Sequence, residues 1–443
     1  MNKHKGKILV LFLAVLLVSV LSCENPFLKK MLVEEETGKT VPEKPHAPFI
    51  EGGASLILSP NKLTIQVNAV TSDGSAVAVE GCTETSLASG MYTALHAKGT
   101  RVILKGKIIK LNCRGNRLTA LNVQGLTALK ELRCSHNRLT ALNVQGLTAL
   151  KELYCDLNRF TALNVQGLTA LQRLECRRNQ LTELNIQGLT ALQWLECDAN
   201  QLTTLNVQGC TALQTLVCYD NQLTELNVQG LTALESLSCE DNQLTALNVQ
   251  GFTALQTLVC YNNQLTELNV QGLTALRGLY CEDNQLTALN VQGFTALEEL
   301  GCSRNRLNAL NVQGCTALRW LSCYGNLLTS LNVQGCTALR WLHCYNNRLT
   351  TLNVQGCTAL QTLDCWGNRL TADAFKKLFD DLPVRADSDD ANCILYTEQT
   401  GVTEGNHTDF TAPQDLKDAF DNAKNNKKWK MYKWNGSWPG VEI

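Results

Sequence analysis

The sequence has little excess charge and little histidine, and its prolines avoid the long middle of the chain. Its 39 lysines and arginines nearly balance 40 aspartates and glutamates, which gives no electrostatic basis for binding nucleic acid. The six histidines form neither His-x-x-His nor His-Glu-x-x-His, so the usual spacings of zinc enzymes are absent. All eight prolines lie outside residues 108–372, where a proline would remove a backbone hydrogen-bond donor.

The sequence also lacks the groupings of residues that catalysis requires. No nucleophile is paired with a base, and His136 and His343 are far apart along the chain. No C-x-x-C motif occurs among the 20 cysteines. We therefore expect neither an enzyme nor a site for a cofactor or metal ion.

What the sequence does contain is a unit of 21 residues, present in thirteen copies without an insertion. Each copy reads L-x-x-L-x-C-x-x-N-x-L, beginning at Ile108 in the first copy and ending at Leu370 in the last. The second half of the unit, as in residues 142–149, alternates leucine and valine with polar residues before a glycine. It predicts a second short extended segment followed by a turn.

Alternation within the unit separates inward from outward side chains. In the copy that begins at Leu150, Leu153 and Cys155 alternate with Glu152 and Tyr154. A period of two predicts a strand with the first pair inside and the second pair outside. The asparagine that recurs in every copy has two donors and an acceptor oxygen. We expect it to bond backbone groups of its own coil and of the neighbouring coil.

This pattern is similar to the leucine-rich repeat, with cysteine in place of the third leucine. More specifically, it resembles the short repeats of lipid-anchored surface proteins from spirochaetes and Bacteroidetes. The resemblance implies a right-handed solenoid, mainly β, with a parallel sheet on its concave face, over residues 108–372. A solenoid needs atypical segments at its ends. We expect a β-rich N-terminal cap at residues 54–107 and an α/β C-terminal cap at residues 373–443.

The C-terminal cap has its own periodicity. Apolar residues recur at helical spacing within 375–382 and again within 416–423. Each helical stripe is followed by a strand-like run, at 393–396 and at 429–434. Helix, strand, helix and strand after the last repeat are expected to extend the parallel sheet by right-handed crossovers.

The start of the chain has the pattern of an export signal. A lysine-rich start precedes an apolar run at residues 8–21, which is too short to span a bilayer comfortably. The run ends in Val-Leu-Ser-Cys, which resembles a bacterial lipobox and implies that Cys23 carries the lipid anchor. We expect residues 1–22 to be a lipoprotein signal peptide and the proline-containing residues 23–53 to be a flexible tether. An ordinary signal peptide with a chance cysteine is the alternative.

The cysteine of each repeat has three interpretations: packing in the core, a disulfide ladder, or a metal or redox row. Equivalent residues of neighbouring strands lie about 4.8 Å apart. Disulfides need Cβ atoms about 3.5–4.5 Å apart. An apolar core also raises thiol pKa values and so disfavours the thiolates that metal or redox chemistry needs. The spacing favours buried, reduced cysteines that pack as small hydrophobic residues.

Function should lie in the outward positions, because there the copies stop resembling one another. Acidic residues such as Glu240 and Glu282 mark the middle copies, and solvation alone is one explanation for them. Exposed clusters of Trp, Tyr and Arg are typical of binding hot spots. The candidate ligand-binding residues are Trp194, Tyr219, Tyr261, Tyr280, Arg319, Trp320, Tyr324, Arg340, Trp341, His343, Tyr345 and Trp366. We expect Trp320 to stack on Trp341 and Tyr324 on Tyr345.

The resemblance implies a monomeric, lipid-anchored protein of the bacterial envelope, on the outer membrane facing the exterior or the periplasm. Similar proteins act in adhesion, so the expected partner is a protein of the host or of a bacterial surface. Membrane contact is expected through the lipid alone. The alternative function is a structural or spacer lipoprotein without a specific ligand.

Overall fold

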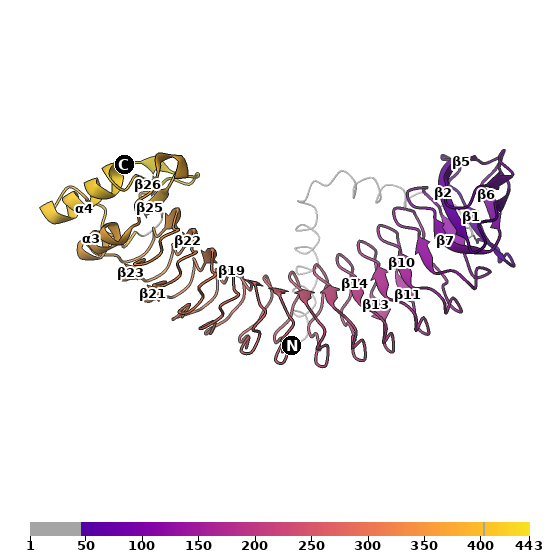
Figure 1. Ribbon diagram of the computed structural model, residues 1–443, viewed down its shortest axis with the longest axis horizontal. Helices are drawn as coiled ribbons and strands as arrows, with labels where there is room; N and C mark the ends of the chain where they lie inside the picture. Colours follow the sequence, from indigo (N-terminus) through magenta and orange to yellow (C-terminus); the bar gives the residue numbers. More distant parts are fainter. Residues whose placement is uncertain (1–45, 402–403) are drawn as a thin grey trace, which may run out of the picture. The chain divides into compact units, whose positions relative to one another are not determined.

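Each repeat contributes one short strand to a parallel sheet, and Figure 1 shows the coils side by side with these strands on the same side. The computed structural model describes residues 46–401 and 404–443, so Cys23, the predicted signal peptide and most of the predicted tether lie outside the described residues. Each strand pairs in register with its equivalent one repeat later, as Leu237 pairs with Leu258. The strands are β7 (Ile108–Asn112), β9 (Glu131–Arg133), β10 (Glu152–Tyr154), β12 (Arg173–Glu175), β14 (Trp194–Glu196), β15 (Thr215–Val217), β16 (Ser236–Ser238), β17 (Thr257–Val259), β18 (Gly278–Tyr280), β19 (Glu299–Gly301), β20 (Trp320–Ser322), β22 (Trp341–His343) and β24 (Thr362–Asp364).

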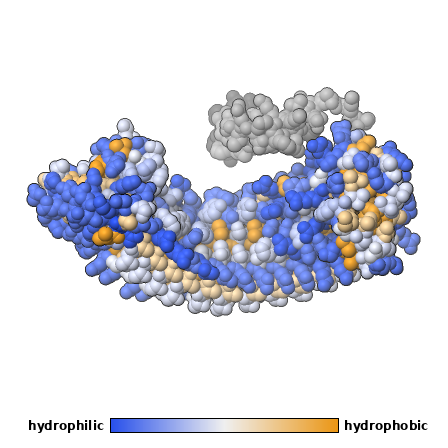
Figure 2. All heavy atoms as spheres, turned by 45° about the horizontal axis from the view of Figure 1, so that its top comes forward, coloured by the Kyte–Doolittle hydropathy of each residue, from blue (hydrophilic) through white to orange (hydrophobic). Residues whose placement is uncertain are grey.

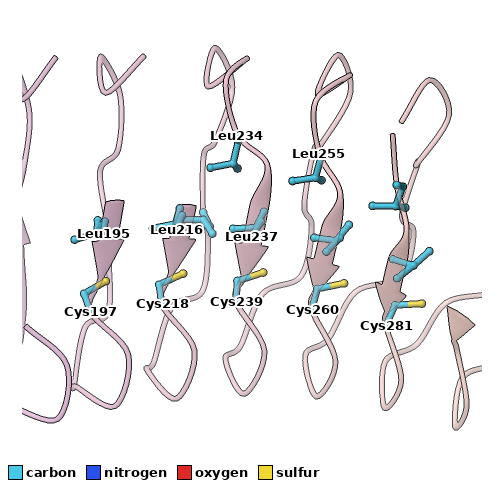
Figure 3. Packing of buried hydrophobic residues seen from close by; sticks show 14 of the residues in the cluster. Leu195, Cys197, Leu216, Cys218, Leu234, Leu237, Cys239, Leu255, Cys260 and Cys281 are labelled. Atoms are coloured by element: carbon cyan, nitrogen blue, oxygen red, sulfur yellow. The ribbon is translucent and has the colours of Figure 1, made fainter. Parts of the chain in front are cut away.

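The alternation within each strand is confirmed. Leu153 and Cys155 are fully buried, whereas Glu152 and Tyr154 are partly exposed. Figure 3 shows the ladder cysteines in one row and the strand leucines, such as Leu195, Leu216 and Leu237, in a neighbouring row, with the sulfur atoms pointing to the same side. Such rows continue from coil to coil, so the core is one continuous column of apolar side chains.

The recurring asparagine holds neighbouring coils together, as expected. The Nδ2 group of Asn158 donates to the carbonyl oxygens of Cys155 in its own coil, at 3.1 Å, and of Cys134 in the preceding coil, at 3.0 Å. Its Oδ1 atom accepts from the backbone N–H of Leu139 at 3.1 Å. The amide therefore satisfies buried backbone groups where the strand ends and the chain turns.

The second half of the unit forms an extended segment on another side of each coil, and in some coils it pairs as a strand. In this half, the backbone N–H of Gln145 donates to Oδ1 of Asn143 at 3.0 Å. Gly146 follows with φ of +83°, a conformation that glycine adopts without steric cost. The paired segments are β8 (Ala120–Asn122), β11 (Ala162–Asn164), β13 (Glu183–Asn185), β21 (Ser330–Asn332) and β23 (Thr351–Asn353).

Strands before the first repeat cover that end of the core. Strand β2 pairs antiparallel with β5 and β7 and so extends the long sheet, while β1 pairs antiparallel with β6 and β8. The bounds are β1 (Gly53–Ile57), β2 (Thr64–Thr71), β3 (Val77–Glu80), β4 (Ser86–Leu87), β5 (Tyr92–His96) and β6 (Arg101–Lys105).

The last residues of the predicted tether are packed against the solenoid. Ala47 is buried, and its carbonyl oxygen accepts from Nδ2 of Asn122 at 3.2 Å. The hydroxyl of Ser55 donates to the carbonyl oxygen of Pro48 at 2.5 Å. The interpretation of residues 47–53 as flexible tether is therefore wrong, because this segment packs against the first coils.

The predicted alternation of helices and strands after the last repeat is confirmed. Strand β24 pairs parallel with β25, and β25 pairs parallel with β26, so the long sheet continues past the repeats. The bounds are α3 (Ala372–Asp381), the 3-10 helix η1 (Asp387–Asp389), β25 (Asn392–Thr397), α4 (Gln414–Asn425), β26 (Lys430–Trp434) and β27 (Val441–Glu442). Within the described ranges, no helix has the length and apolar character needed to cross a membrane.

Candidate functional site

The exposed side of the long sheet, which we call the sheet face, carries side chains in columns. Because the strands are in register, Trp320, Trp341 and Thr362 are direct neighbours across β20, β22 and β24. Equivalent side chains of adjacent coils therefore lie within contact distance. What differs from coil to coil along these columns determines what the sheet face can bind.

On the early coils, the aromatic side chains of the sheet face are held by arginines. The guanidinium carbon of Arg133 lies 4.3 Å from the ring centroid of Tyr154, and that of Arg173 lies 4.3 Å from the ring centroid of Trp194. The indole N–H of Trp194 donates to Glu196 at 2.8 Å. The side chain of Trp194 thus makes its contacts with Arg173 and Glu196, and it lies on an early coil, whereas the other candidate tryptophans lie on the late coils.

Two acidic side chains of the middle coils are removed from solvent, because Glu240 is buried and Glu282 is half-buried. Burial raises the pKa values of Glu240 and Glu282, both of which follow a ladder cysteine directly. Tyr219 and Tyr261 occupy the same column, and burial raises their pKa values too. Solvation alone therefore does not explain these two glutamates, because burial sets them apart from freely exposed charges. Figure 2 shows some hydrophobic side chains, bordered by hydrophilic ones, on the visible surface over the middle coils.

Aromatic rings on the last coils form a continuous stack. Tyr324 lies on Tyr345 with ring centroids 4.4 Å apart, and Tyr345 lies on Trp366 at 4.6 Å. Trp366 in turn faces Trp434 of β26 at 5.7 Å, and each successive pair of rings is within 8° of parallel. The predicted stacking of Tyr324 on Tyr345 is confirmed. Arg304 covers the other end, with its guanidinium carbon 5.5 Å from the ring centroid of Tyr324.

The neighbouring column of tryptophans does not stack as predicted. Trp320 and Trp341 are paired strand residues, but the ring of Trp320 turns instead to Tyr280, with centroids 6.2 Å apart and planes at 38°. The Tyr280 hydroxyl donates to the carboxylate of Glu299. Trp341 is left 38% exposed, which makes it the most exposed tryptophan on the strands of the sheet. The expected stack of Trp320 on Trp341 is wrong because a second aromatic neighbour competes for Trp320.

The remaining candidates surround these rings. The Nδ1–H group of His343 donates to Oδ2 of Asp364, on the adjacent strand, at 2.6 Å. Arg319 and Arg340 are exposed, and Arg319 also lies 3.3 Å from the carboxylate of Glu298. The late-coil candidates are thus together at one end of the sheet face, whereas Trp194 is not.

Two contributors were missed from the sequence. They are Trp434, which lies on Trp366, and Trp438, which lines the same pocket as the late-coil rings. Both come within reach of the last repeats because β25 and β26 continue the parallel sheet. The sequence does contain a signal for this arrangement, in the two strand-like runs after the last repeat. Pairing these runs in register with the strands of the repeats brings the C-terminal tryptophans close to the last coils.

The ladder cysteines offer no reactive thiol. All the described cysteines are unpaired and buried. Burial raises the pKa of Cys113 to about 12 and that of Cys155 well above the ordinary thiol value. Among the described residues, no group of histidine, cysteine and acidic side chains could hold a metal ion.

We predict that the ladder cysteines resist alkylation in the folded protein and react fully on denaturation without reductant, because they are buried thiols. Mass spectrometry after iodoacetamide treatment would count the labelled cysteines in each condition. Cysteines that label after denaturation only when a reductant is added would reveal disulfides and contradict this assignment.

A comparison of the sequence with protein-family models finds no match, and neither does a comparison with curated proteins. Solved structures do match. The functional domain of InlJ from Listeria monocytogenes, which includes a cysteine ladder, is 28% identical, with 74% of each chain covered and a TM-score of 0.59. A leucine-rich repeat protein of Leptospira interrogans is 27% identical over 61% of this chain and 81% of that one, with a TM-score of 0.51.

The fold is a leucine-rich repeat solenoid. This confirms the fold class predicted from the repeat. The similar structures are of bacterial leucine-rich repeat proteins, and the cysteine ladder of InlJ is a counterpart of the row of buried cysteines found here. In a leucine-rich repeat solenoid the stacked repeats present an extended surface, which is the general basis for binding another protein.

Proposed function

We propose that this leucine-rich repeat protein is a lipid-anchored protein of the bacterial cell surface that binds a partner protein of the host or of another bacterium. The observation that supports this function most is the aromatic group on the last coils, where Trp320, Trp341 and Tyr345 occupy outward positions that vary among the copies. Large aromatic side chains, flanked by exposed arginines such as Arg319 and Arg340, are typical of binding hot spots. A purely structural solenoid has no need of them.

The proposed organisation assigns a separate task to each segment. Residues 1–22 direct export, Cys23 carries the lipid, and the tether holds the solenoid away from the membrane. The N-terminal cap at 54–107 and the C-terminal cap at 373–443 close the ends of the repeat core. In this arrangement the protein faces the exterior as a monomer, and its contact with the membrane is through the lipid.

We predict that Cys23→Ala releases the protein from the membrane fraction, because the substitution removes the site of lipid attachment. Fractionation of expressing cells followed by immunoblotting measures this. Cys82→Ala is a suitable control, since Cys82 is a cysteine outside the repeats and has no role in anchoring. If the Cys23→Ala protein still sediments with membranes, the anchor lies elsewhere.

Capture experiments test the proposed function itself. The mature protein, immobilised through its N-terminus, is incubated with extracted host-matrix proteins and with bacterial surface proteins, and the bound proteins are identified by mass spectrometry. A saturable, specific partner supports a binding protein. Absence of specific capture from both sources would favour the spacer lipoprotein, in which the solenoid serves as a structural element of the envelope.

A further inference from the structure

A small pocket lies where the last coils meet the C-terminal strands. Its volume is about 330 Å³, at the lower end of the range for ligand sites, which suits a single ring and not an extended ligand. Its lining includes Trp320 from the sheet face, Trp366 from the last repeat, and Trp434 and Trp438 from the C-terminal cap. The pocket therefore exists only where the repeats and the cap are joined, and no other coil can reproduce it.

The aromatic stack is part of the lining of this pocket, and its rings are packed face to face. The rings of Tyr324, Tyr345 and Trp366 cover one another's faces at 4.4 and 4.6 Å, and Arg304 lies over the outer face of Tyr324. Cation binding by aromatic rings needs an open face. The stacked rings therefore leave little open face, and the guanidinium of Arg304 already occupies one end of the stack.

The polar groups of the pocket exclude a purely apolar occupant as well. Asp364 has a side chain only 5% exposed, and its Oδ2 atom lies 2.6 Å from Nδ1 of His343. The other carboxylate oxygen, Oδ1, has no hydrogen-bond partner among the residues that the structure describes. Since Nδ1 of His343 is engaged, Nε2 is the ring nitrogen left for a ligand. An apolar group that covered this pair would exclude water without replacing its hydrogen bonds.

We propose that this pocket binds one pyranose residue of a glycan. A pyranose has an apolar C–H face that can lie against the indole of Trp438, which is 56% exposed. It also carries several hydroxyl groups that can donate to the Asp364 carboxylate and pair with His343. This combination of an apolar face with many donors matches both the exposed indole of Trp438 and the polar Asp364–His343 pair, which an apolar side chain does not. The pocket shares Trp320 and Tyr345 with the proposed protein-binding surface, but binding of a sugar there does not depend on a partner protein.

The test is a titration of the full-length protein with the methyl glycosides of glucose, galactose, mannose and N-acetylglucosamine, followed by tryptophan fluorescence. At ordinary ligand efficiency a monosaccharide binds with a dissociation constant of about 1 mM. We expect a saturable signal with at least one glycoside. Trp438→Ala and His343→Ala should each weaken it about tenfold or more, as loss of a central contact does. Trp194→Ala, a tryptophan on the distant coils, should leave the affinity unchanged.

Because Trp438 is largely exposed, Trp438→Ala should fold normally, and its circular dichroism spectrum checks this. A wild-type protein that responds to none of the four glycosides would overturn the proposal. So would a response that persists in both pocket variants. Competition at the pocket by a captured protein, with no glycoside binding, would show that a protein side chain is the occupant. Failure of the capture experiment alone would bear on the partner protein and not on this site.

Discussion

Replacement of Asn242 by alanine is expected to destabilise the solenoid strongly. Its Nδ2 group donates to the carbonyl oxygens of Cys218 and Cys239, both at 3.1 Å, and its Oδ1 atom accepts from the N–H of Leu223 at 2.9 Å. Loss of partners for buried backbone groups costs about 1–3 kcal/mol for each group, so we expect the free energy of unfolding to fall by about 3 kcal/mol. Urea denaturation followed by circular dichroism measures this change.

The adjacent residue provides the control. Gln243 is exposed, and Gln243→Ala leaves the asparagine ladder intact, so its effect should be within about 0.5 kcal/mol of wild type, as for most surface substitutions. Equal stabilities for the two variants would mean that the ladder contributes little and that apolar packing alone holds the coils in register.

Removal of two tryptophans from the late coils is expected to weaken the binding of the partner protein strongly. Trp320→Ala combined with Trp341→Ala should weaken the binding of a captured partner protein at least about thirtyfold, because a hot-spot aromatic contributes about 2 kcal/mol or more. Both side chains lie on the sheet face, and Trp341 is 38% exposed, so the solenoid should remain folded. Surface plasmon resonance with the captured partner gives the two dissociation constants.

A matched pair on the early coils controls for the loss of aromatic area. Tyr154→Ala with Trp194→Ala removes two side chains that are already held by arginines, and it should change the affinity little. Glu240 and Glu282 are less suitable controls, since their partial burial links them to stability. If the early pair abolishes binding and the late pair does not, the partner docks at the other end of the sheet face.

Most of the fold could be predicted from the repeat, because each residue that recurs in all copies makes contacts within its own coil or with a neighbouring coil. Leu153 and Cys155 fill the core of their own coil, and Asn158 bonds the coil before it. These contacts recur at every turn, so one unit of sequence predicts all of them. The N-terminal boundary was harder, since burial of Ala47 depends on a contact with Asn122, far along the chain.

The candidate site was predictable only in part. Stacking of Tyr324 on Tyr345 follows directly from the register of adjacent strands. The position of Trp434 depends on how the cap continues the sheet, and the turn of Trp320 toward Tyr280 depends on competition between two neighbours. Such outcomes are decided by packing between unlike residues, which a repeat pattern does not encode.

Hydroxyl-radical footprinting shows whether the late coils of the sheet face bind the partner. Oxidation of individual side chains is compared by mass spectrometry between the free protein and its complex with the captured partner. We predict that Trp341 and Tyr345 are protected in the complex, whereas Trp194 keeps its free-state oxidation. Unchanged oxidation of Trp341 and Tyr345, with protection elsewhere on the solenoid, would contradict it.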